Sequence, residues 1–437
     1  MLLYIFTFMT KFYILKKKIM QRLYLLLFVI FGTTSILSSQ KPEALRIDYV
    51  HNGDHKKETI TIYRLVSEPY FSGNRNHDIY PFDYGNYKVE VKRLTDNKIL
   101  YSYHYNSLFN EWQATEMAKS ESRSFQESVK IPYPTDPVSI IFYSRDDNLS
   151  WNKVYSHELD PSSDFIIQDH PKKYASEKIK DAGDYHSNMD LLIIPDGYTK
   201  DELDKYHKDA KRFRDYLLKC APFDKHTDKI NVWTIDVISQ ESGTDKPTKD
   251  EWKSTALDAS FNTFKSQRYL TTYSHFALRE AASCTPYDLI FILVNDDLYG
   301  GGGIFNFYSV ATADDEHADF LMVHEFGHHF GCLGDEYYTS EVAIEDYHKT
   351  DIEPYEPNLT TLVDFDSKWK DMMEKDTPVP TPDSSANKNT IGVYEGGGYV
   401  AKGVYRPYID CTMKSAKYDN FCPVCQRALV KMLHYYT

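Results

Sequence analysis

The run His324-Glu325-Phe326-Gly327-His328 constrains this chain more than any other feature. Two histidines four residues apart on a helix point to the same side, where they can share one zinc ion. Glu325 is then placed to act as general base toward the water that the zinc activates. The apolar positions from Ala318 to Phe330 predict a buried helix, in which two histidines without partners would be costly. The pattern predicts a zinc-dependent peptidase, with His324 and His328 binding one catalytic Zn²⁺.

The third zinc ligand is expected shortly after Gly331, where the helix is predicted to stop and the chain to turn back. Asp335 is the favoured ligand, because it comes first after the turn and a carboxylate oxygen is an ordinary zinc donor. Glu336 is the competitor, and the two residues could instead form a solvated acidic pair. His329 is expected to point away from its neighbour His328 by helix geometry.

The net charge argues against one class of partner, and the N-terminal segment predicts where the protein is located. A net charge of −14 over 437 residues argues against a nucleic-acid binder. Met20-Gln-Arg, a short apolar run and a small-residue end resemble a secretory signal within residues 1–39, with Met20 as the true start. The alternative is a transmembrane anchor, for which the apolar run is short, so no stable anchor is expected. An exported protein follows, either periplasmic, at the cell surface or secreted.

The chain is expected to be a multidomain α+β protein. Residues 40–160 contain alternating strand patterns separated by turn residues, which predict an N-terminal β-sandwich. Residues 161–184 are rich in Pro, Ser, Asp and Lys and are interpreted as a linker. Residues 185–437 alternate strands and helices and predict an α/β catalytic domain with a mixed sheet beside the active-site helix. Within it, the glycine run 300–303 is expected to form an edge strand along which an extended peptide could add.

Six cysteines are compatible with export without proving disulfides. Cys422-Pro-Val-Cys425 could be a redox or metal pair. A second Cys-x-x-Cys is missing, however, so a structural use is favoured, and pairing cannot be deduced from sequence.

Several separated segments resemble the metzincin clan and, within it, the bacterial IgA-specific metallopeptidase family. They are residues 324–337, 356–360, 394–399, 403–407, 411–413 and 421–425, together with 45–49 and 108–115 near the N-terminus. The resemblance implies an N-terminal β-sandwich joined to a metzincin-like catalytic domain. It also implies that Met413 occupies the Met-turn beneath the zinc ligands. The clan places its third ligand three residues after the glycine, where this chain has Gly334, so Asp335 comes one residue late.

Two further expectations rest on the resemblance. Some metzincins stabilise the oxyanion with a tyrosine two residues after the Met-turn methionine, where this chain has Ser415. Tyr418, Tyr405 and Tyr399 are the alternatives, each with ordinary packing as the competing role. The substrate is expected to be a protein or peptide, with host glycoproteins or immunoglobulins as possibilities. The alternative function is a surface adhesin whose sandwich binds protein or glycan and whose peptidase domain is secondary or inactive.

Overall fold

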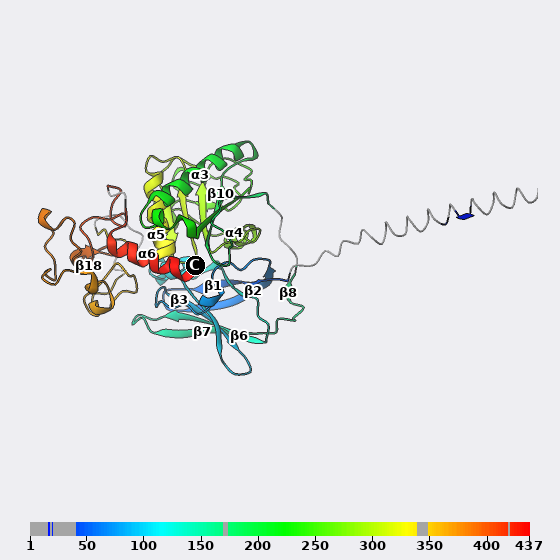
Figure 1. Cartoon of the computed structure of the whole chain (residues 1–437), viewed down its shortest axis with the longest axis horizontal. Coiled ribbons are helices and arrows are strands. Elements are labelled where there is room, and N and C mark those ends of the chain that lie inside the picture. The colour runs from blue at the N-terminus through cyan, green and yellow to red at the C-terminus, as the bar shows by residue number, and fades with distance from the viewer. Residues whose placement is uncertain (1–15, 18–19, 21–40, 169–173, 339–347, 418–419) are drawn as a thin grey trace, which may run out of the picture. The chain divides into compact units, whose positions relative to one another are not determined.

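The computed structural model describes residues 16–17, 20, 41–168, 174–338, 348–417 and 420–437. Contacts divide the chain into two units, Met1–Lys41 and Pro42–Thr437. The expected signal segment falls almost wholly outside the described residues. No helix in the described ranges is both long and apolar enough to cross a membrane. The second unit contains the sheets and helices labelled in Figure 1.

Two four-stranded sheets make up most of the N-terminal region. The first contains, in order, β5 (Arg123–Pro132), β1 (Ala44–Gly53), β2 (Glu58–Glu68) and β8 (Ile166–Ile167). The second contains β4 (Ile99–Tyr105), β3 (Tyr87–Arg93), β6 (Val138–Arg145) and β7 (Trp151–Leu159). Tyr49 of β1 packs edge-on against Phe142 of β6, with 5.0 Å between ring centroids, so the two sheets share one apolar core.

This region is not all β as expected, because a short helix interrupts it. Helix α2 (Leu108–Gln113) begins at a reciprocal cap: Ser107 Oγ accepts from the Phe109 N–H at 3.2 Å, and Asn110 Oδ1 accepts from the Ser107 N–H at 2.9 Å. Such a cap satisfies backbone donors that a helix start leaves free. Leu108, Phe109 and Trp112 are buried. The apolar face of α2 therefore packs into the core of this region.

A six-stranded mixed sheet forms the centre of the second region. Its order is β15 (Gly301–Ile304), β16 (Tyr308–Thr312), β14 (Leu289–Val294), β10 (Met189–Asp196), β11 (Ile230–Ile235) and β9 (Ser176–Lys180). The four central strands are parallel, and the strand at each edge is antiparallel to its neighbour. Strands β10 and β14 are buried along their whole length, as expected for central parallel strands. The stretch interpreted as a linker contributes β8 to one sheet and β9 to another.

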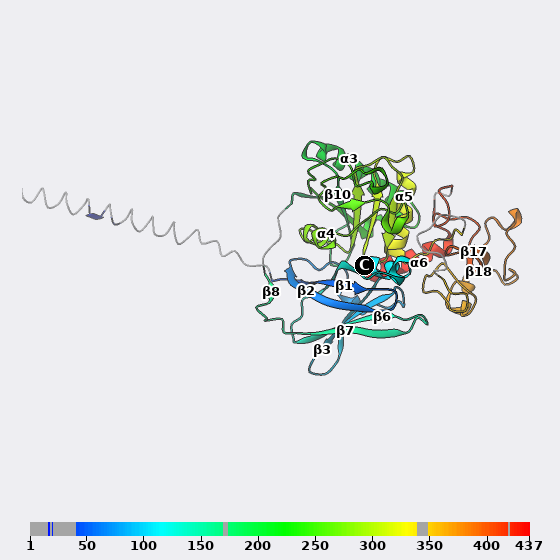
Figure 2. The ribbon, with the colours of Figure 1, turned by 180° about the vertical axis from the view of Figure 1, so that it is seen from behind.

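Four helices of eight or more residues accompany this sheet: α3 (Leu203–Lys219), α4 (His275–Ala282), α5 (Ala318–Gly331) and α6 (Pro423–Tyr436). Helix α5 packs against β15 and β16 and contacts α3 and α6. Figure 2 shows α6 beside the small hairpin of β17 (Tyr394–Gly397) and β18 (Val400–Arg406). A second two-stranded sheet pairs β12 (Ala259–Ser260) with β13 (Thr271–Thr272). The element types agree with the expected α+β class.

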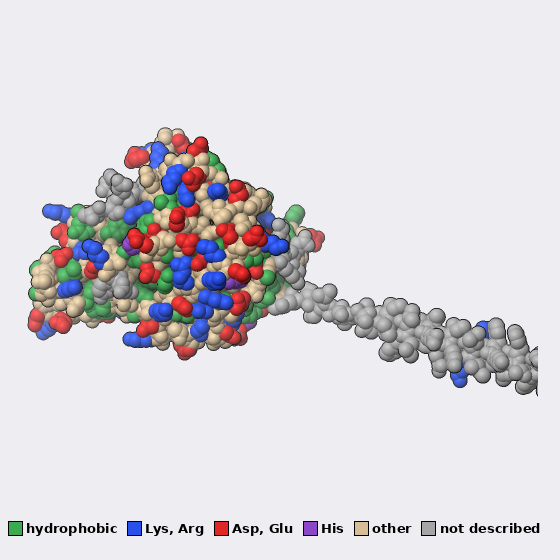
Figure 3. Space-filling model, turned by 90° about the horizontal axis from the view of Figure 1, so that it is seen from above, with side chains coloured by type: hydrophobic (Ala, Val, Ile, Leu, Met, Phe, Trp, Pro, Cys, Tyr) green, Lys and Arg blue, Asp and Glu red, His purple; other side chains and the backbone are tan. Residues whose placement is uncertain are grey.

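Polar contacts join the two regions into one unit. The Arg46 guanidinium on β1 is buried and donates to Glu280 at 2.8 Å and to the Arg279 carbonyl on α4 at 3.1 Å. The Asn106 N–H donates to the Phe305 carbonyl at 2.9 Å, and Asn306 Nδ2 donates to a β4 carbonyl at 2.8 Å. The turn between β15 and β16 is therefore held by the N-terminal region. In the face drawn in Figure 3, basic and acidic side chains are interspersed.

Candidate active site and metal centre

Three side chains converge on one point between α5 and the loop that follows it. His324 Nε2 and His328 Nε2 lie 3.2 Å apart, and Asp335 Oδ1 lies 3.2 Å from the first and 3.4 Å from the second. Donor atoms at about 2.0–2.1 Å from a tetrahedral zinc lie about 3.3 Å from one another. The three atoms therefore already have the mutual spacing of ligands in a zinc site.

The surroundings of these atoms also fit a metal ion. His324 Nδ1 lies 3.0 Å from the Thr412 carbonyl and His328 Nδ1 lies 2.6 Å from the Leu333 carbonyl. Each Nδ1–H donates to its carbonyl, which leaves a lone pair on each Nε2. Asp335 Oδ1 is buried and has no hydrogen-bond partner. Two lone pairs and a buried carboxylate oxygen in contact form a set of donor atoms suited to a cation.

Glu325 lies beside this centre and, with the two histidines, forms a group that could also hold a metal ion. One carboxylate oxygen of Glu325 and the ring nitrogens of both histidines lie within 4.8 Å of one another. Burial raises the pKa of Glu325. Gly301 is close: a Cβ there would approach Glu325 Oε1 to 2.8 Å. A carboxylate at this distance and with a raised pKa is suited to exchange a proton with a water at the metal.

The loop that brings Asp335 back begins at Cys332, which corrects the role expected for Gly331. Cys332 adopts the left-handed conformation, with φ 52°, and its N–H closes the helix end onto the His328 carbonyl. Gly331 is the last helical residue, and a Cβ on it would approach Leu429 of α6 to 2.7 Å. The glycine is needed for close helix packing, and its neighbour makes the turn.

The tip of the β17–β18 hairpin holds the Asp335 loop. Gly398 and Tyr399 both have positive φ, 57° and 66°, as a two-residue hairpin turn of this hand requires. The Gly398 N–H donates to the Asp335 carbonyl at 2.7 Å, and the Tyr399 N–H donates to the Tyr337 carbonyl at 3.1 Å. The Tyr399 hydroxyl donates to Asp335 Oδ2. A tyrosine in this sparsely populated backbone region is strained, and here its hydroxyl fixes the Asp335 carboxylate.

The three tyrosines considered for the oxyanion are placed differently. Tyr399 is hydrogen-bonded to Asp335, so its hydroxyl orients the Asp335 carboxylate. Tyr405 pairs through its backbone with Thr360 and is not among the described residues that line the catalytic cavity. Tyr418 lies outside the described residues. Ser415 lines the cavity, and its hydroxyl donates to Asp410 at 2.8 Å.

His329 and Glu336 both point away from the centre. His329 Nδ1 lies 3.1 Å from Ser309 Oγ on β16, and burial lowers the pKa of this histidine to about 3. It is a neutral core histidine. Glu336 is fully buried and directs its carboxylate to Asn358 and Cys425. Adjacent side chains on an extended segment point to opposite sides, so Asp335 and Glu336 serve different places.

Met413 packs beneath α5, the helix that carries His324 and His328. A Cβ on Gly327, which lies between the two histidines on α5, would approach Met413 Sδ to 2.7 Å. Met413 is fully buried. The small residue and the thioether therefore allow the chain at 411–413 to approach the helix closely, and the Thr412 carbonyl reaches His324.

A cavity of about 530 Å³ opens over this centre. Its lining includes Arg268, Tyr269, Tyr299 and, from helix α2 of the N-terminal region, Glu111. Burial raises the pKa of Glu111 to about 7, against the hydrogen bond that the Tyr269 hydroxyl donates. Glu111 lies in the segment 108–115 that resembles the family, but nothing in the sequence marked it as a site residue. The N-terminal region thus contributes a carboxyl group to the cavity.

Comparison with known families identifies the chain. The family described as IgA Peptidase M64 matches residues 178–390 and 383–433, and the family described as Peptidase M64 N-terminus matches residues 38–156. The chain belongs to the IgA peptidase M64 family. This confirms the expected resemblance. No curated protein matches the chain. As an M64 peptidase, the protein is a metallopeptidase, and protein or peptide chains are its substrates.

The glycine-rich strand β15 of this M64 peptidase is an edge strand, but the segment 268–270 already pairs with part of its free edge. The Gly301 N–H donates to the Arg268 carbonyl at 3.3 Å, and the Leu270 N–H donates to the Gly301 carbonyl at 3.2 Å. An extended peptide therefore cannot pair with β15 at Gly301. A Cβ on Gly303 would come within 2.2 Å of the Glu325 carbonyl, so this glycine allows β15 to lie directly against α5.

Proposed function

We propose that the protein is an exported zinc endopeptidase with a metzincin-like catalytic domain. The observation that carries the proposal is the set of three donor atoms on His324, His328 and Asp335, spaced 3.2–3.4 Å apart. Three nitrogen and oxygen ligands on one side leave the fourth position of a tetrahedral zinc free, which is the arrangement of catalytic zinc sites. Family membership supplies the reaction class.

A zinc ion bound here would lower the pKa of a water molecule and polarise a peptide carbonyl. Glu325 takes the proton from the attacking water at its carboxylate and passes it to the leaving amine as the C–N bond breaks. The carbonyls of Thr412 and Leu333 keep the Nδ1–H tautomer of both histidines. Tyr399 holds the Asp335 carboxylate in place through its hydrogen bond.

The cavity supports binding of a peptide segment. Its volume of about 530 Å³ is in the range of ligand-binding pockets and can hold several side chains of a substrate. Its lining combines aromatic rings with Arg268 and Glu111. Two groups of opposite charge at different points of one cavity can orient a polar chain across the metal. Export is proposed from the signal-like segment before residue 40.

The test is cleavage of a mixture of denatured proteins by the purified chain, with and without a chelator. We expect many internal cleavages that stop on chelation and return when zinc is added. Cleavage that survives complete removal of metal would contradict the proposal. Retention of a protein or glycan without any cleavage would favour the adhesin alternative.

A further inference from the structure

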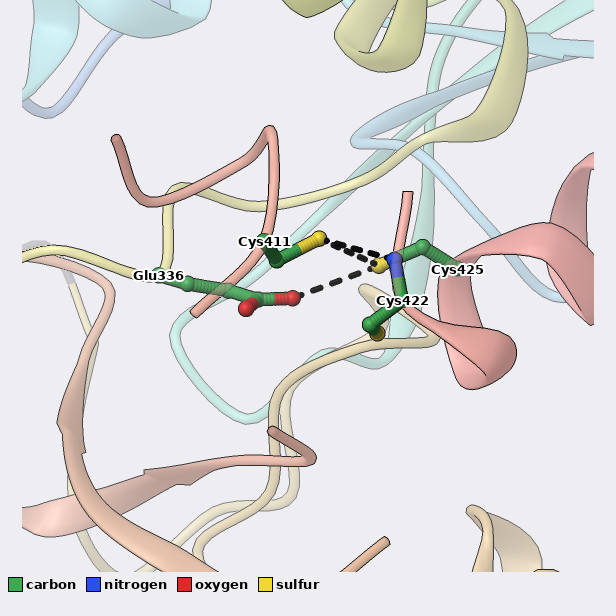
Figure 4. Close-up of side chains that lie close together, drawn as sticks. All are labelled: Glu336, Cys411, Cys422 and Cys425. Carbon is green, nitrogen blue, oxygen red and sulfur yellow. Dashed lines mark hydrogen bonds between the residues drawn. The ribbon is translucent and has the colours of Figure 1, made fainter. Parts of the chain in front are cut away.

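A second group of metal-ligand residues lies outside the catalytic cavity. One carboxylate oxygen of Glu336 and the sulfurs of Cys411, Cys422 and Cys425 all lie within 4.8 Å of one another. All four residues are fully buried. Figure 4 shows the carboxylate and the cysteines converging from three separate segments of the chain. None of the four is among the described residues that line the catalytic cavity.

The spacing of the sulfurs suits a metal ion rather than a formed disulfide. Cys411 Sγ and Cys425 Sγ are 3.9 Å apart. Thiolates bound to a tetrahedral zinc at about 2.3 Å lie about 3.8 Å from each other, whereas a disulfide requires about 2.0 Å. Cys425 Sγ lies 3.2 Å from Glu336 Oε1, which completes a fourth corner.

Glu336 provides an independent reason to expect a cation. Its Oε1 accepts from Asn358 Nδ2 at 3.0 Å, but its Oε2 is buried with no hydrogen-bond partner. No salt bridge to Glu336 occurs within the described parts of the chain. A buried carboxylate with an unsatisfied oxygen is costly unless a cation or a metal compensates it.

We propose that Glu336, Cys411, Cys422 and Cys425 bind a second, structural divalent ion of the zinc type. Three thiolates and a carboxylate occupy all four tetrahedral positions, so the site is closed and has no place for a substrate. The proposal does not depend on the zinc at His324 and His328.

The position of this cluster indicates a structural role near the catalytic centre. Glu336 directly follows Asp335, and Cys411 precedes Thr412, whose carbonyl accepts from His324. Cys422 and Cys425 lie at the start of α6. A metal at this point would tie the ligand loop, the segment under α5 and helix α6 together. It would thereby position the catalytic ligands without touching the substrate.

The first test counts metal in the full chain purified with zinc. We expect two zinc ions per wild-type chain, and one in a His324→Ala/His328→Ala variant. A wild-type chain with one zinc that the histidine changes remove would overturn the second site. One zinc that the histidine changes leave in place would instead support the thiolate site and contradict the catalytic one.

The second test distinguishes the ligands, and its first measurement needs no cysteine variant to fold. With cobalt in place of zinc, the histidine variant should keep the thiolate-to-cobalt charge-transfer absorption in the near ultraviolet. Loss of that absorption, or a disulfide between any two of the three cysteines in mass mapping of unreduced protein, would refute the proposal. Cys425→Ser should lose the band and one metal, whereas Cys284→Ser, outside the cluster, should retain both.

Discussion

The Glu336 N–H donates a hydrogen bond to the Met413 carbonyl at 2.8 Å. This bond joins the loop that carries Asp335 to the segment that lies under the active-site helix. The Thr412 carbonyl, one residue before Met413, accepts from His324, so the same segment contacts both His324 and the loop that carries Asp335. The catalytic centre is therefore built on a shared backbone framework, which can be probed one residue at a time.

The third ligand can be tested by comparing two neighbouring substitutions. Asp335→Ala should lose the catalytic zinc and all peptidase activity, because only two histidine ligands remain. Glu336→Ala should keep zinc at the histidines, since its side chain points to the cysteines. Zinc content of each variant, measured in a Cys425→Ser background to remove the second site, decides the matter. Loss of the catalytic zinc in Glu336→Ala alone would reverse the assignment.

Tyr399→Phe tests whether the hairpin tip orients Asp335. Removing the hydroxyl deletes the hydrogen bond to Asp335 Oδ2. Mutation of a residue that hydrogen-bonds to a metal ligand typically lowers metal affinity by about 10–100-fold, and we expect the zinc affinity of Tyr399→Phe to fall in that range. Competition with a chelator measures it. Unchanged zinc affinity with reduced turnover would instead make Tyr399 an oxyanion donor, and Tyr405→Phe is the matched control.

Glu111 is expected to set a preference for basic substrates. At pH 8 its carboxylate is largely ionised, because its pKa is about 7. A charge-assisted hydrogen bond to a substrate cation contributes about 1.5–3 kcal/mol. Glu111→Gln should therefore lower kcat/KM for lysine- or arginine-containing peptides by roughly tenfold or more, while neutral peptides change little. An equal loss for both peptide classes would indicate a role in folding or positioning instead.

Much of this site could be predicted from the sequence, for local reasons. Residues four apart lie on the same face of any helix, so the proximity of His324 and His328, with Glu325 beside them, could be predicted once a helix was expected there. The extra residue before Asp335 left open whether Asp335 or Glu336 is the third ligand. In the structure Asp335 faces the histidines and Glu336 faces Cys425. Glu111 and the Glu336–cysteine cluster could not be predicted, because they depend on segments up to hundreds of residues apart meeting in space. Helix α2 and strands β8 and β9 were not predicted, because such short elements carry little periodic pattern of their own and depend on packing against neighbouring elements.

His51 gives the fold a pH dependence at alkaline pH. It is buried between Glu58 and Glu127, at 3.0 and 3.2 Å, and stacks on Phe109 of α2. Burial lowers its pKa, but the two carboxylates raise it more, to about 9. The charged form is thus favoured in the folded state. Its stabilisation is complete below about pH 6.5, the value in unfolded chains, and is lost as the pH rises through 9.

The free energy of unfolding should therefore fall between pH 6.5 and 9.5, by up to roughly 3 kcal/mol from this group. His51→Gln should be less stable at pH 6.5 and should show a flatter pH profile in urea unfolding. His55→Gln, at an exposed position near the same turn, should leave the profile unchanged. A profile that stays equally steep in His51→Gln would exclude this histidine as its source.

The most direct test of the catalytic account is the turnover of Glu325→Gln on an internally cleaved peptide, with its zinc content measured in parallel. Glutamine keeps the shape of the side chain but cannot take a proton from water. We predict wild-type zinc content, an unchanged fold and a kcat reduced by about 10²–10⁴-fold. Near-native turnover by this variant, purified free of host proteases, would contradict the assignment of Glu325 as the general base.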